Sequence, residues 1–392
     1  MWSLAWPAKA ELIASGVFRT STQMIKFSFV LIPSHPPIPA IWPFLRHRVF
    51  CPPVGLLSNL LGLRHERADN GPLILRPATA AEIEPAIALI LSPPGASADT
   101  QSTREFIAFA RERGIDFDGL HVALRDGKLV SAILSVVSPG RTMLMLCPPG
   151  AGGNAADAAT AQLIDPVCRH SAAQGIHLAQ TLVDPGDTAL EAIFAQQQFD
   201  KMAELHYLQV QVAAGSTFPV LPPDLTWTIY SADNHALFGQ AIIDSYKDSL
   251  DCPALNGRRN VEDIMAGHHA SGIFDPSLWF LLRRVPVPST VEGPVPSTVE
   301  GPTMLGVLLL SKSLRSDAVE LVYLGLSPNA RGQKLGELMM RQAFAVVASY
   351  QQPRLCLAVD SRNTPALKLY YRHGMHRIAS KLALLRDLRK LV

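Results

Sequence analysis

The chain has few charged residues and few cysteines for its length. Of its 392 residues 17% are charged, five are cysteines, and the formal net charge is +2. The cysteines are scattered and form no C-x-x-C pair, which argues against a disulfide framework and a structural zinc site. No long run of lysine and arginine indicates a nucleic-acid or anionic membrane partner. We therefore expect a cytoplasmic protein with no metal and no nucleic-acid partner.

No apolar segment predicts a transmembrane helix. Residues 27–45 are apolar, but five prolines (33, 36, 37, 39 and 43) interrupt them, and unpaired backbone groups are costly in lipid. The segment also does not directly follow a basic N-terminus, as the core of a signal peptide would. We interpret residues 1–70 as a poorly structured extension and predict no membrane partner.

Two familiar phosphate-binding signatures are absent from the stretch that otherwise suits a phosphate. Residues 324–340, LGLSPNARGQKLGELMM, contain neither G-x-x-x-x-G-K-[ST] nor G-x-G-x-x-G. They predict the end of a strand, a tight turn with Arg331 and Gly332, and a helix that begins near Gly332. Unpaired amides at the start of this helix, together with its dipole, would form an anion site. The alternative is an ordinary strand–turn–helix capped by Asn329.

A second set of signals follows this helix. Leu355, Leu357 and Val359 alternate with smaller residues and predict a half-buried strand. Asn363 is suited to cap the next helix, which has Pro365 in its first turn. Gly374 is suited to end that helix near residue 373.

The two strings L-x-L-x-P-x-x-R-G-x-x-x-G and N-x-x-A-x-x-L-Y-x-x-x-G resemble two motifs of the GNAT (GCN5-related N-acetyltransferase) superfamily. The first resembles the acyl-CoA pyrophosphate loop, with Lys334 where a glycine is usual. The second runs from Asn363 to Gly374, with Met375 where phenylalanine is usual. The resemblance is good in the C-terminal part of the chain and weak in the middle.

This resemblance implies a mixed α/β (α+β) fold, acetyl-CoA as the cosubstrate, and direct transfer of the acetyl group to a primary amine. It also implies that the strand before the loop pairs with the pantetheine arm and splays away from the strand at 355–359. The residues implied to bind the cofactor are Leu324, Gly325, Leu326, Arg331, Gly332, Gln333, Lys334, Leu335, Gly336 and Asn363.

Two residues are candidates for proton transfer. Tyr370 matches the tyrosine that protonates the leaving thiolate in the family, and a phenol with a pKa near 10 suits that role. The alternative is a core tyrosine. Glu320 is expected to share a strand face with Val322, Leu324 and Leu326, from which it could deprotonate the amine. The alternative is a solvated glutamate at a strand end.

The order of predicted elements occurs twice along the chain. After a proline-containing joint at 218–223, a second series of strands and helices begins at 225. We therefore predict an N-terminal extension, a degenerate GNAT-like domain and a GNAT acetyltransferase domain, at residues 1–70, 71–214 and 215–392. The first-half elements are expected as strands at 73–79, 120–125, 129–137, 142–147, 176–183 and 204–212, and as helices at 80–91, 103–113, 155–174 and 188–196.

The first half lacks the basic loop of the second half. At the equivalent place residues 148–154, PPGAGGN, follow a strand and precede a helix. Three glycines would let the backbone approach a pyrophosphate, but a glycine-rich connection in a degenerate domain fits equally well. Phe194 stands where the tyrosine would be expected, so we predict no catalysis in this half.

Two local features do not require a separate function. The string VPSTVEGP occurs at 287–294 and again at 295–302, in a loop at 286–302. We interpret it as a duplication in an exposed loop, although loops of this kind can also bind partners. His268 and His269 are adjacent and so face different sides of a helix, without a third ligand nearby. We expect a surface or core role for both.

The sequence thus predicts an acyl-CoA-dependent N-acyltransferase whose chemistry lies in the C-terminal domain. Its partner would be a small-molecule amine or a protein amine, and the oligomeric state is not indicated. A catalytically silent acyl-CoA-binding or scaffold protein is the alternative, and Lys334 in place of glycine is the feature that favours it.

Overall fold

The computed structural model describes residues 71–92, 100–152, 154–285, 303–313, 318–350 and 353–391. The predicted extension at 1–70 and the repeat-containing loop at 286–302 lie outside these ranges. No helix within them is long and apolar enough to cross a membrane.

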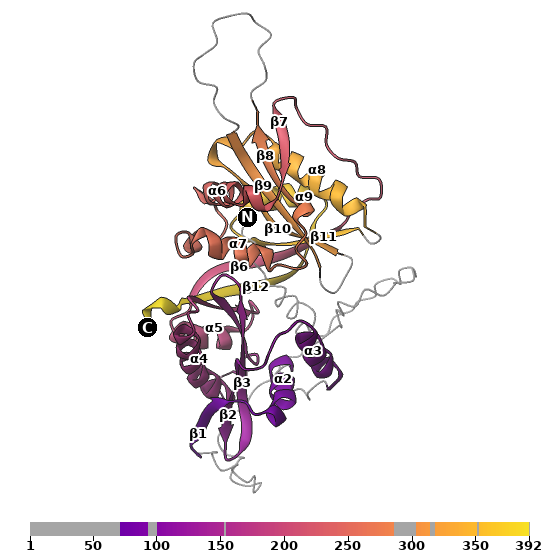
Figure 1. The fold of residues 1–392 in the computed structure, drawn as a ribbon. Helices are drawn as coiled ribbons and strands as arrows, with labels where there is room; N and C mark the ends of the chain where they lie inside the picture. The colour runs from indigo at the N-terminus through magenta and orange to yellow at the C-terminus, as the bar shows by residue number, and fades with distance from the viewer. Residues whose placement is uncertain are drawn as a thin grey trace, which may run out of the picture.

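The described strands form one mixed sheet of twelve strands, in the order β1-β2-β3-β4-β5-β12-β6-β11-β10-β9-β8-β7 (Figure 1). The pairs β4·β5 and β10·β11 are parallel, and the other neighbouring pairs are antiparallel. The expected mixed α/β class is therefore confirmed. The strands are β1 (Leu73–Pro77), β2 (Leu120–Arg125), β3 (Lys128–Ser138), β4 (Thr142–Leu146), β5 (Leu178–Val183), β6 (Asp200–Gln211), β7 (Leu225–Ile229), β8 (Trp279–Arg284), β9 (Thr303–Lys312), β10 (Ala318–Leu326), β11 (Arg354–Asp360) and β12 (His376–Asp387).

Helices flank both halves of this sheet (Figure 1). Some begin where the sequence predicts, such as α4 and α5, whereas others differ by about three residues. The helix expected from 103 begins at Thr100, and the helix expected from Gly332 begins at Leu335. Gly332 and Lys334 adopt left-handed backbone conformations, with φ of 79° and 58°, which a right-handed helix cannot contain. The helices are α2 (Ile83–Leu91), α3 (Thr100–Glu112), α4 (Ala155–Ala173), α5 (Thr188–Gln196), α6 (His235–Tyr246), α7 (Val261–His269), α8 (Leu335–Ala348) and α9 (Thr364–Arg372).

The two halves exchange their last strands. β12, the final strand of the chain, lies between β5 and β6, and β6 lies between β12 and β11. In Figure 1 these two long strands cross the middle of the molecule. The division at about residue 214 stays a prediction, but the sheet hydrogen bonds run across it. Each half therefore depends on the other for a neighbour to its last strand.

The largest hydrophobic cluster fills the second half. It joins the central strands β8–β11 to α6–α9, and its fully buried side chains include Phe238, Trp279, Tyr323 and Tyr370. Two smaller clusters belong mainly to the first half. Tyr207 on β6 packs against the largest cluster and one of the smaller ones, so the exchanged strand also joins their apolar interiors.

Candidate active site

β10 and β11 pair only at their beginnings. The parallel register joins Ala318–Glu320 to Arg354–Cys356, although β10 continues to Leu326 and β11 to Asp360. The expected splay of these strands is therefore confirmed. Leu324, Gly325 and Leu326 pair with β9 on one edge of β10, and the edge toward β11 has no strand partner there.

A β-bulge on β10 changes the predicted orientation of Glu320. Glu320 lies opposite Ser311 and Tyr323 lies opposite Leu309, so Val322 is the inserted residue. Residues directly opposite each other in a sheet share a face, and Ser311 and Leu309 are two residues apart. Glu320 therefore shares its face with Tyr323. The expectation that it shares a face with Val322, Leu324 and Leu326 is wrong, because the bulge reverses the alternation.

The two faces of β10 carry different helices. A Cβ placed on Gly325 would lie 2.5 Å from Ser245 Oγ of α6, so this face is covered by α6. Leu326 points the other way, since a Cβ on Gly336 of α8 would lie 4.0 Å from its Cδ1. Glu320 and Tyr323 thus face α6, and Leu324 and Leu326 face α8.

The loop between β10 and α8 presents a run of unused amides. The amides of Ala330 and Arg331 are bonded to the carbonyls of Ser327 and Pro328, and the amide of Glu337 to that of Lys334. The amides of residues 332–336 have no acceptor among the residues that the structure describes. Such amides, together with the positive end of the α8 dipole, favour an anion, and the binding of one at this loop stays a prediction.

Arg331 connects this loop to the end of α6. Its guanidinium donates hydrogen bonds to the carbonyls of Ser245 (2.9 Å), Lys247 (2.6 Å), Asp248 (3.1 Å) and Leu326 (3.2 Å). A cation is favourable at a helix C-terminus, where carbonyls lack intrahelical partners. The Arg331 side chain therefore fixes the position of the loop, and its guanidinium is already hydrogen-bonded to these carbonyls.

The residues that follow Arg331 in the loop make contacts with the surrounding structure. The Gln333 side chain donates to the Asn329 carbonyl (2.6 Å) and accepts from Arg284 (3.1 Å). Leu335 is buried, and Gly336 lies close to Leu369 of α9, where a Cβ would be 3.1 Å from Leu369 Cδ2. Gly336 thus permits close contact of α8 with α9.

The helix α9 begins and ends as predicted. The side chain of Asn363 accepts a hydrogen bond from the Ala366 amide (3.4 Å), and Gly374 follows the helix with φ of 78°. Tyr370 is fully buried. Burial, and secondly the negative charge of Asp251, raises its pKa well above 10. Tyr370 is therefore protonated before any reaction.

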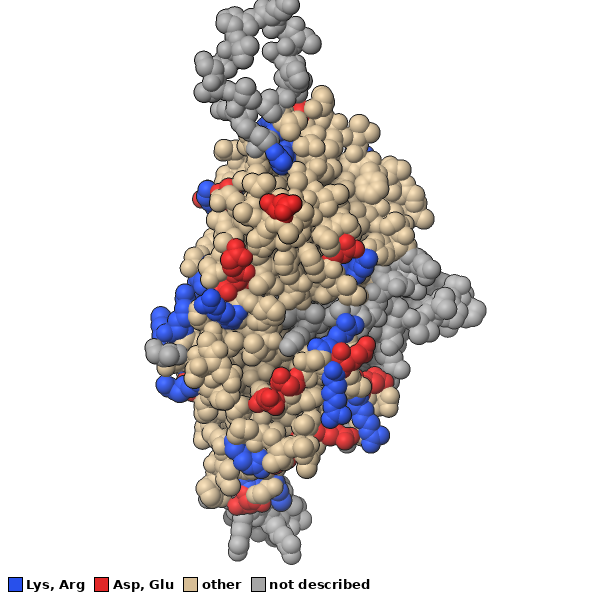
Figure 2. Space-filling model, in the orientation of Figure 1, with Lys and Arg blue, Asp and Glu red and all other residues tan. Residues whose placement is uncertain are grey.

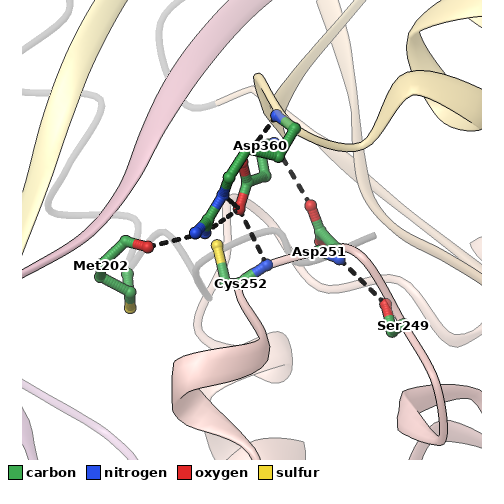
Figure 3. A network of polar contacts seen from close by, with 6 residues as sticks. Met202, Ser249, Asp251, Cys252 and Asp360 are labelled. Carbon is green, nitrogen blue, oxygen red and sulfur yellow. Dashed lines mark hydrogen bonds and ion pairs between the residues drawn. The ribbon is translucent and has the colours of Figure 1, made fainter.

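A buried polar network holds the segment after α6 against the end of β11 (Figure 3). The Asp360 carboxylate accepts hydrogen bonds from Arg362 (2.6 Å) and from the Cys252 amide (3.1 Å). Arg362 also donates to the carbonyl of Met202 on β6 (2.8 Å). Asp251 accepts a hydrogen bond from the Asp360 amide, and burial raises the pKa of Asp251 to about 6. Sequence reasoning missed this pair, because the two residues are 109 positions apart along the chain.

The first half supplies Tyr207 to the same face as Glu320. Tyr207 lies opposite Ala358, and Cys356, two residues before Ala358, lies opposite Glu320. Burial raises the pKa of Tyr207 well above 10, and the charge of Glu320 adds to this effect. Sequence reasoning missed Tyr207 because nothing local shows that β6 pairs with β11.

In the glycine-rich loop of the first half, two backbone amides are already hydrogen-bonded to aspartate carboxylates of the same half. The Gly150 amide donates to Asp187 (2.7 Å), and the Ala151 amide donates to Asp157 (2.9 Å). Phe194, at the position expected for a tyrosine, packs edge-on against Phe199. The amides that would bind an anion here already face negative charge. Among the described residues, no group of three or more His, Cys, Asp or Glu side chains is placed to hold a metal ion.

Comparison with known proteins agrees with this geometry. Residues 291–375 match the profile of the acetyltransferase (GNAT) family. A mycothiol acetyltransferase from Jonesia denitrificans is 35% identical over 71 residues, which are 18% of this chain and 23% of that protein. The chain thus spans about a quarter of the curated relative that it matches.

One solved structure with a TM-score above 0.5 shows the same fold. A GCN5-related N-acetyltransferase from Sphaerobacter thermophilus aligns with 81% of this chain and 97% of its own, with a TM-score of 0.53 and 15% identity. A tandem GNAT protein from the clavulanic acid biosynthesis pathway, without AcCoA, aligns with 81% and 99%, with a TM-score of 0.45 and 12% identity.

The splayed parallel strands and the loop with unpaired amides lie at the same end of β10 in a mixed α/β fold. Residues 291–375 thus resemble the acetyltransferase (GNAT) family, and the described chain has a GNAT-type fold.

Proposed function

We propose that this protein is an N-acetyltransferase that moves an acetyl group from acetyl-CoA to a primary amine. The observation that carries this proposal is the run of unused amides at 332–336, next to the splayed ends of β10 and β11. The first feature suits a pyrophosphate, and the second leaves a strand edge for an extended pantetheine arm.

The residues of this chain would divide the work as follows. Amides 332–336 hold the pyrophosphate, and the free edge of β10 at Leu324–Leu326 orients the thioester. A backbone amide in the splay would polarise the thioester carbonyl, since a preorganised donor favours the oxyanion that develops during attack. Asn363, at the start of α9, would contact the cofactor as well as cap its helix.

Glu320 and Tyr370 would move the protons. Glu320 takes a proton from the ammonium group, and the amine nitrogen attacks the carbonyl carbon to give a tetrahedral intermediate. The carbon–sulfur bond then breaks, and Tyr370 gives its proton to the thiolate. The attacking nitrogen loses its second proton to the Tyr370 phenolate through solvent, which restores the tyrosine. Burial raises the pKa of the Tyr370 phenol, and it would raise the pKa of a buried CoA thiol in the same way. The difference between the two pKa values is therefore retained, and the proton can still pass from the phenol to the thiolate.

The first half would bind no cofactor. Its loop amides at Gly150 and Ala151 already donate to carboxylates, and a pyrophosphate there would meet the charges of Asp187 and Asp157. Like charges about 4 Å apart repel by about 4 kcal/mol at an effective dielectric constant of about 20. We therefore infer one acetyl-CoA site per chain and no catalysis in residues 71–214.

A catalytically silent acyl-CoA-binding protein is the alternative, favoured by Lys334. However, Lys334 has a φ of 58°, within the range that a glycine would use at that place. The lysine therefore leaves the amide run intact, and turnover of any amine would exclude the silent alternative.

The first experiment is native mass spectrometry of the full chain with acetyl-CoA. Gly332→Asp is the test variant, because Gly332 faces open space and the change adds a carboxylate to the anion site. Lys334→Gly is the control, since it alters the same loop without adding an anion. We expect one bound molecule in the unmodified protein and in Lys334→Gly, and at least about tenfold weaker binding in Gly332→Asp. Absence of binding in the unmodified protein would contradict the proposed function.

A further inference from the structure

His268 on α7 is a buried imidazole without a hydrogen-bond partner. Only 1% of the residue is exposed, and neither Nδ1 nor Nε2 has a partner among the residues that the structure describes. A buried polar atom left unpaired costs roughly 1–3 kcal/mol, so such groups are rare in native structures. The sequence interpretation of His268 as an ordinary surface or core residue leaves this cost unexplained.

The imidazole lies over the side chains that cover the active-site face of β10. Its ring centroid is 5.4 Å from that of Tyr323, with 36° between the ring planes. Tyr246 packs edge-on against the same tyrosine at 5.8 Å, and Ser245 Oγ lies 2.6 Å from the Tyr323 hydroxyl. Since Tyr323 shares its face with Glu320, His268 lies on the Glu320 side of the sheet.

The end of α7 is also fixed close to Glu320. Ser311 is the residue directly opposite Glu320, and its hydroxyl donates a hydrogen bond to the carbonyl of Ser271. The Ser271 amide in turn donates to the His268 carbonyl (3.2 Å). The backbone that carries His268 is therefore held one strand away from the proposed base.

The environment keeps this imidazole neutral. Burial, and secondly the charge of Arg259, lowers the pKa of His268 to about 3. A neutral imidazole has one N–H donor and one nitrogen acceptor, so it suits a hydroxyl or an amide better than a carboxylate. It is also too weak a base at neutral pH to replace Glu320.

We propose that His268 is a specificity residue, which hydrogen-bonds a hydroxyl or amide group that the acceptor carries near its amine. This inference rests on the proposed function and names the chemistry of its acceptor. A site that pairs a buried polar group with the substrate discriminates strongly against an analogue without that group, because the site is then left unpaired.

The experiment uses the full chain, acetyl-CoA and three pairs of amines that differ in a hydroxyl group. The pairs are L-serinamide and L-alaninamide, ethanolamine and ethylamine, and tyramine and phenethylamine. For at least one pair, we expect the unmodified protein to favour the hydroxylated amine by about tenfold or more in kcat/KM. In His268→Leu this ratio should fall to nearly one, while the KM for acetyl-CoA stays unchanged. His268→Gln, which retains a donor and an acceptor, should recover part of the ratio.

The control is His269→Leu. His269 is the next residue on α7, and its ring lies 4.7 Å from that of Trp279, in an aromatic group that includes Tyr230. This variant should keep the preference for the hydroxylated amine. A purely structural His268 predicts a different result, because His268→Leu would then keep or raise the midpoint of urea unfolding and leave the ratio unchanged.

The outcomes separate the two proposals. Acetylation of amines without a hydroxyl preference, or with a preference that survives in His268→Leu, would overturn the role of His268 alone. Acetyl-CoA binding with no acetylation of any amine would overturn the proposed function and this inference with it.

Discussion

Asp251 accepts a hydrogen bond from the backbone amide of Asp360, with 3.2 Å between Asp251 Oδ1 and Asp360 N. This bond joins the segment after α6 to the end of β11, beyond the point where β10 ceases to pair with it. Both residues are fully buried. The segment after α6 is therefore held by a carboxyl group whose charge the interior disfavours.

The first prediction follows from the charge of Asp251. Burial raises the pKa of Asp251 from its ordinary value of 3.8 to about 6, so the folded state prefers the protonated form. Stability from this group is fully present below about pH 4 and is lost as the pH rises through 6. The loss approaches about 3 kcal/mol. Asp251→Asn should remove this part of the pH dependence.

The measurement is urea unfolding of both proteins at pH 4 and pH 8. We expect Asp251→Asn to be the more stable protein at pH 8 and similar to the unmodified protein at pH 4. Asp248→Asn is the control, since Asp248 is an exposed aspartate of the same segment. Equal pH dependence in the Asp251→Asn and unmodified proteins would show that the buried carboxyl carries no penalty.

The second prediction concerns the first-half loop. Asp187 accepts from the Gly150 amide and also caps α5 through the Leu190 amide (2.9 Å). Asp187→Ala should lower the free energy of unfolding by about 1–3 kcal/mol, because it removes a helix cap and leaves the Gly150 amide unpaired. Asp187→Asn, which retains an acceptor oxygen, should lower the free energy of unfolding by less than Asp187→Ala does.

Native mass spectrometry of these two variants tests the role of the loop. Both should bind the same number of acetyl-CoA molecules as the unmodified protein, since the carboxylate has a structural role there. A second molecule bound to the unmodified protein would show that the glycine-rich loop is a working site.

The third prediction concerns Lys334, which adopts a left-handed backbone at φ of 58°. This conformation costs a residue with a Cβ about 1–2 kcal/mol, and glycine is free of that cost. Lys334→Gly should therefore be about 1 kcal/mol more stable than Lys334→Ala, which keeps the Cβ and removes the same charge. Urea unfolding of the pair measures the difference, and equal stability would mean that the strain is absent.

Local signals in the sequence account for much of the fold. Asn363, Pro365 and Gly374 mark the ends of α9 through capping and backbone preference, which depend on neighbouring residues only. The left-handed Lys334 shifts the start of α8 by a few residues, and no composition signal reveals it. The strand positions were predictable, because alternation of apolar residues is a local property, but their ends were not: β6 begins at Asp200, four residues before the predicted start at 204.

The remaining features depend on contacts between distant residues. The exchange of β6 and β12 is invisible in the sequence, since either strand has the pattern needed to pair with several neighbours. The bulge at Val322 places Glu320 on the opposite face of β10 from Leu324 and Leu326, and no glycine or proline at this position indicates a bulge. His268 and Tyr207 acquire their surroundings only when α7 and β6 pack near β10 and β11.

The last prediction tests Tyr370 as the proton donor. Tyr370→Phe removes only the hydroxyl, so the packing of the buried ring in the core is retained. Loss of general acid catalysis should lower kcat by about 10²–10⁴-fold and leave the KM for acetyl-CoA little changed. Tyr371→Phe is the matched control, because Tyr371 is its neighbour on α9 and is 47% exposed. If both variants keep full kcat with any acetylated amine, the thiolate leaves without this proton, and Tyr370 is a core residue.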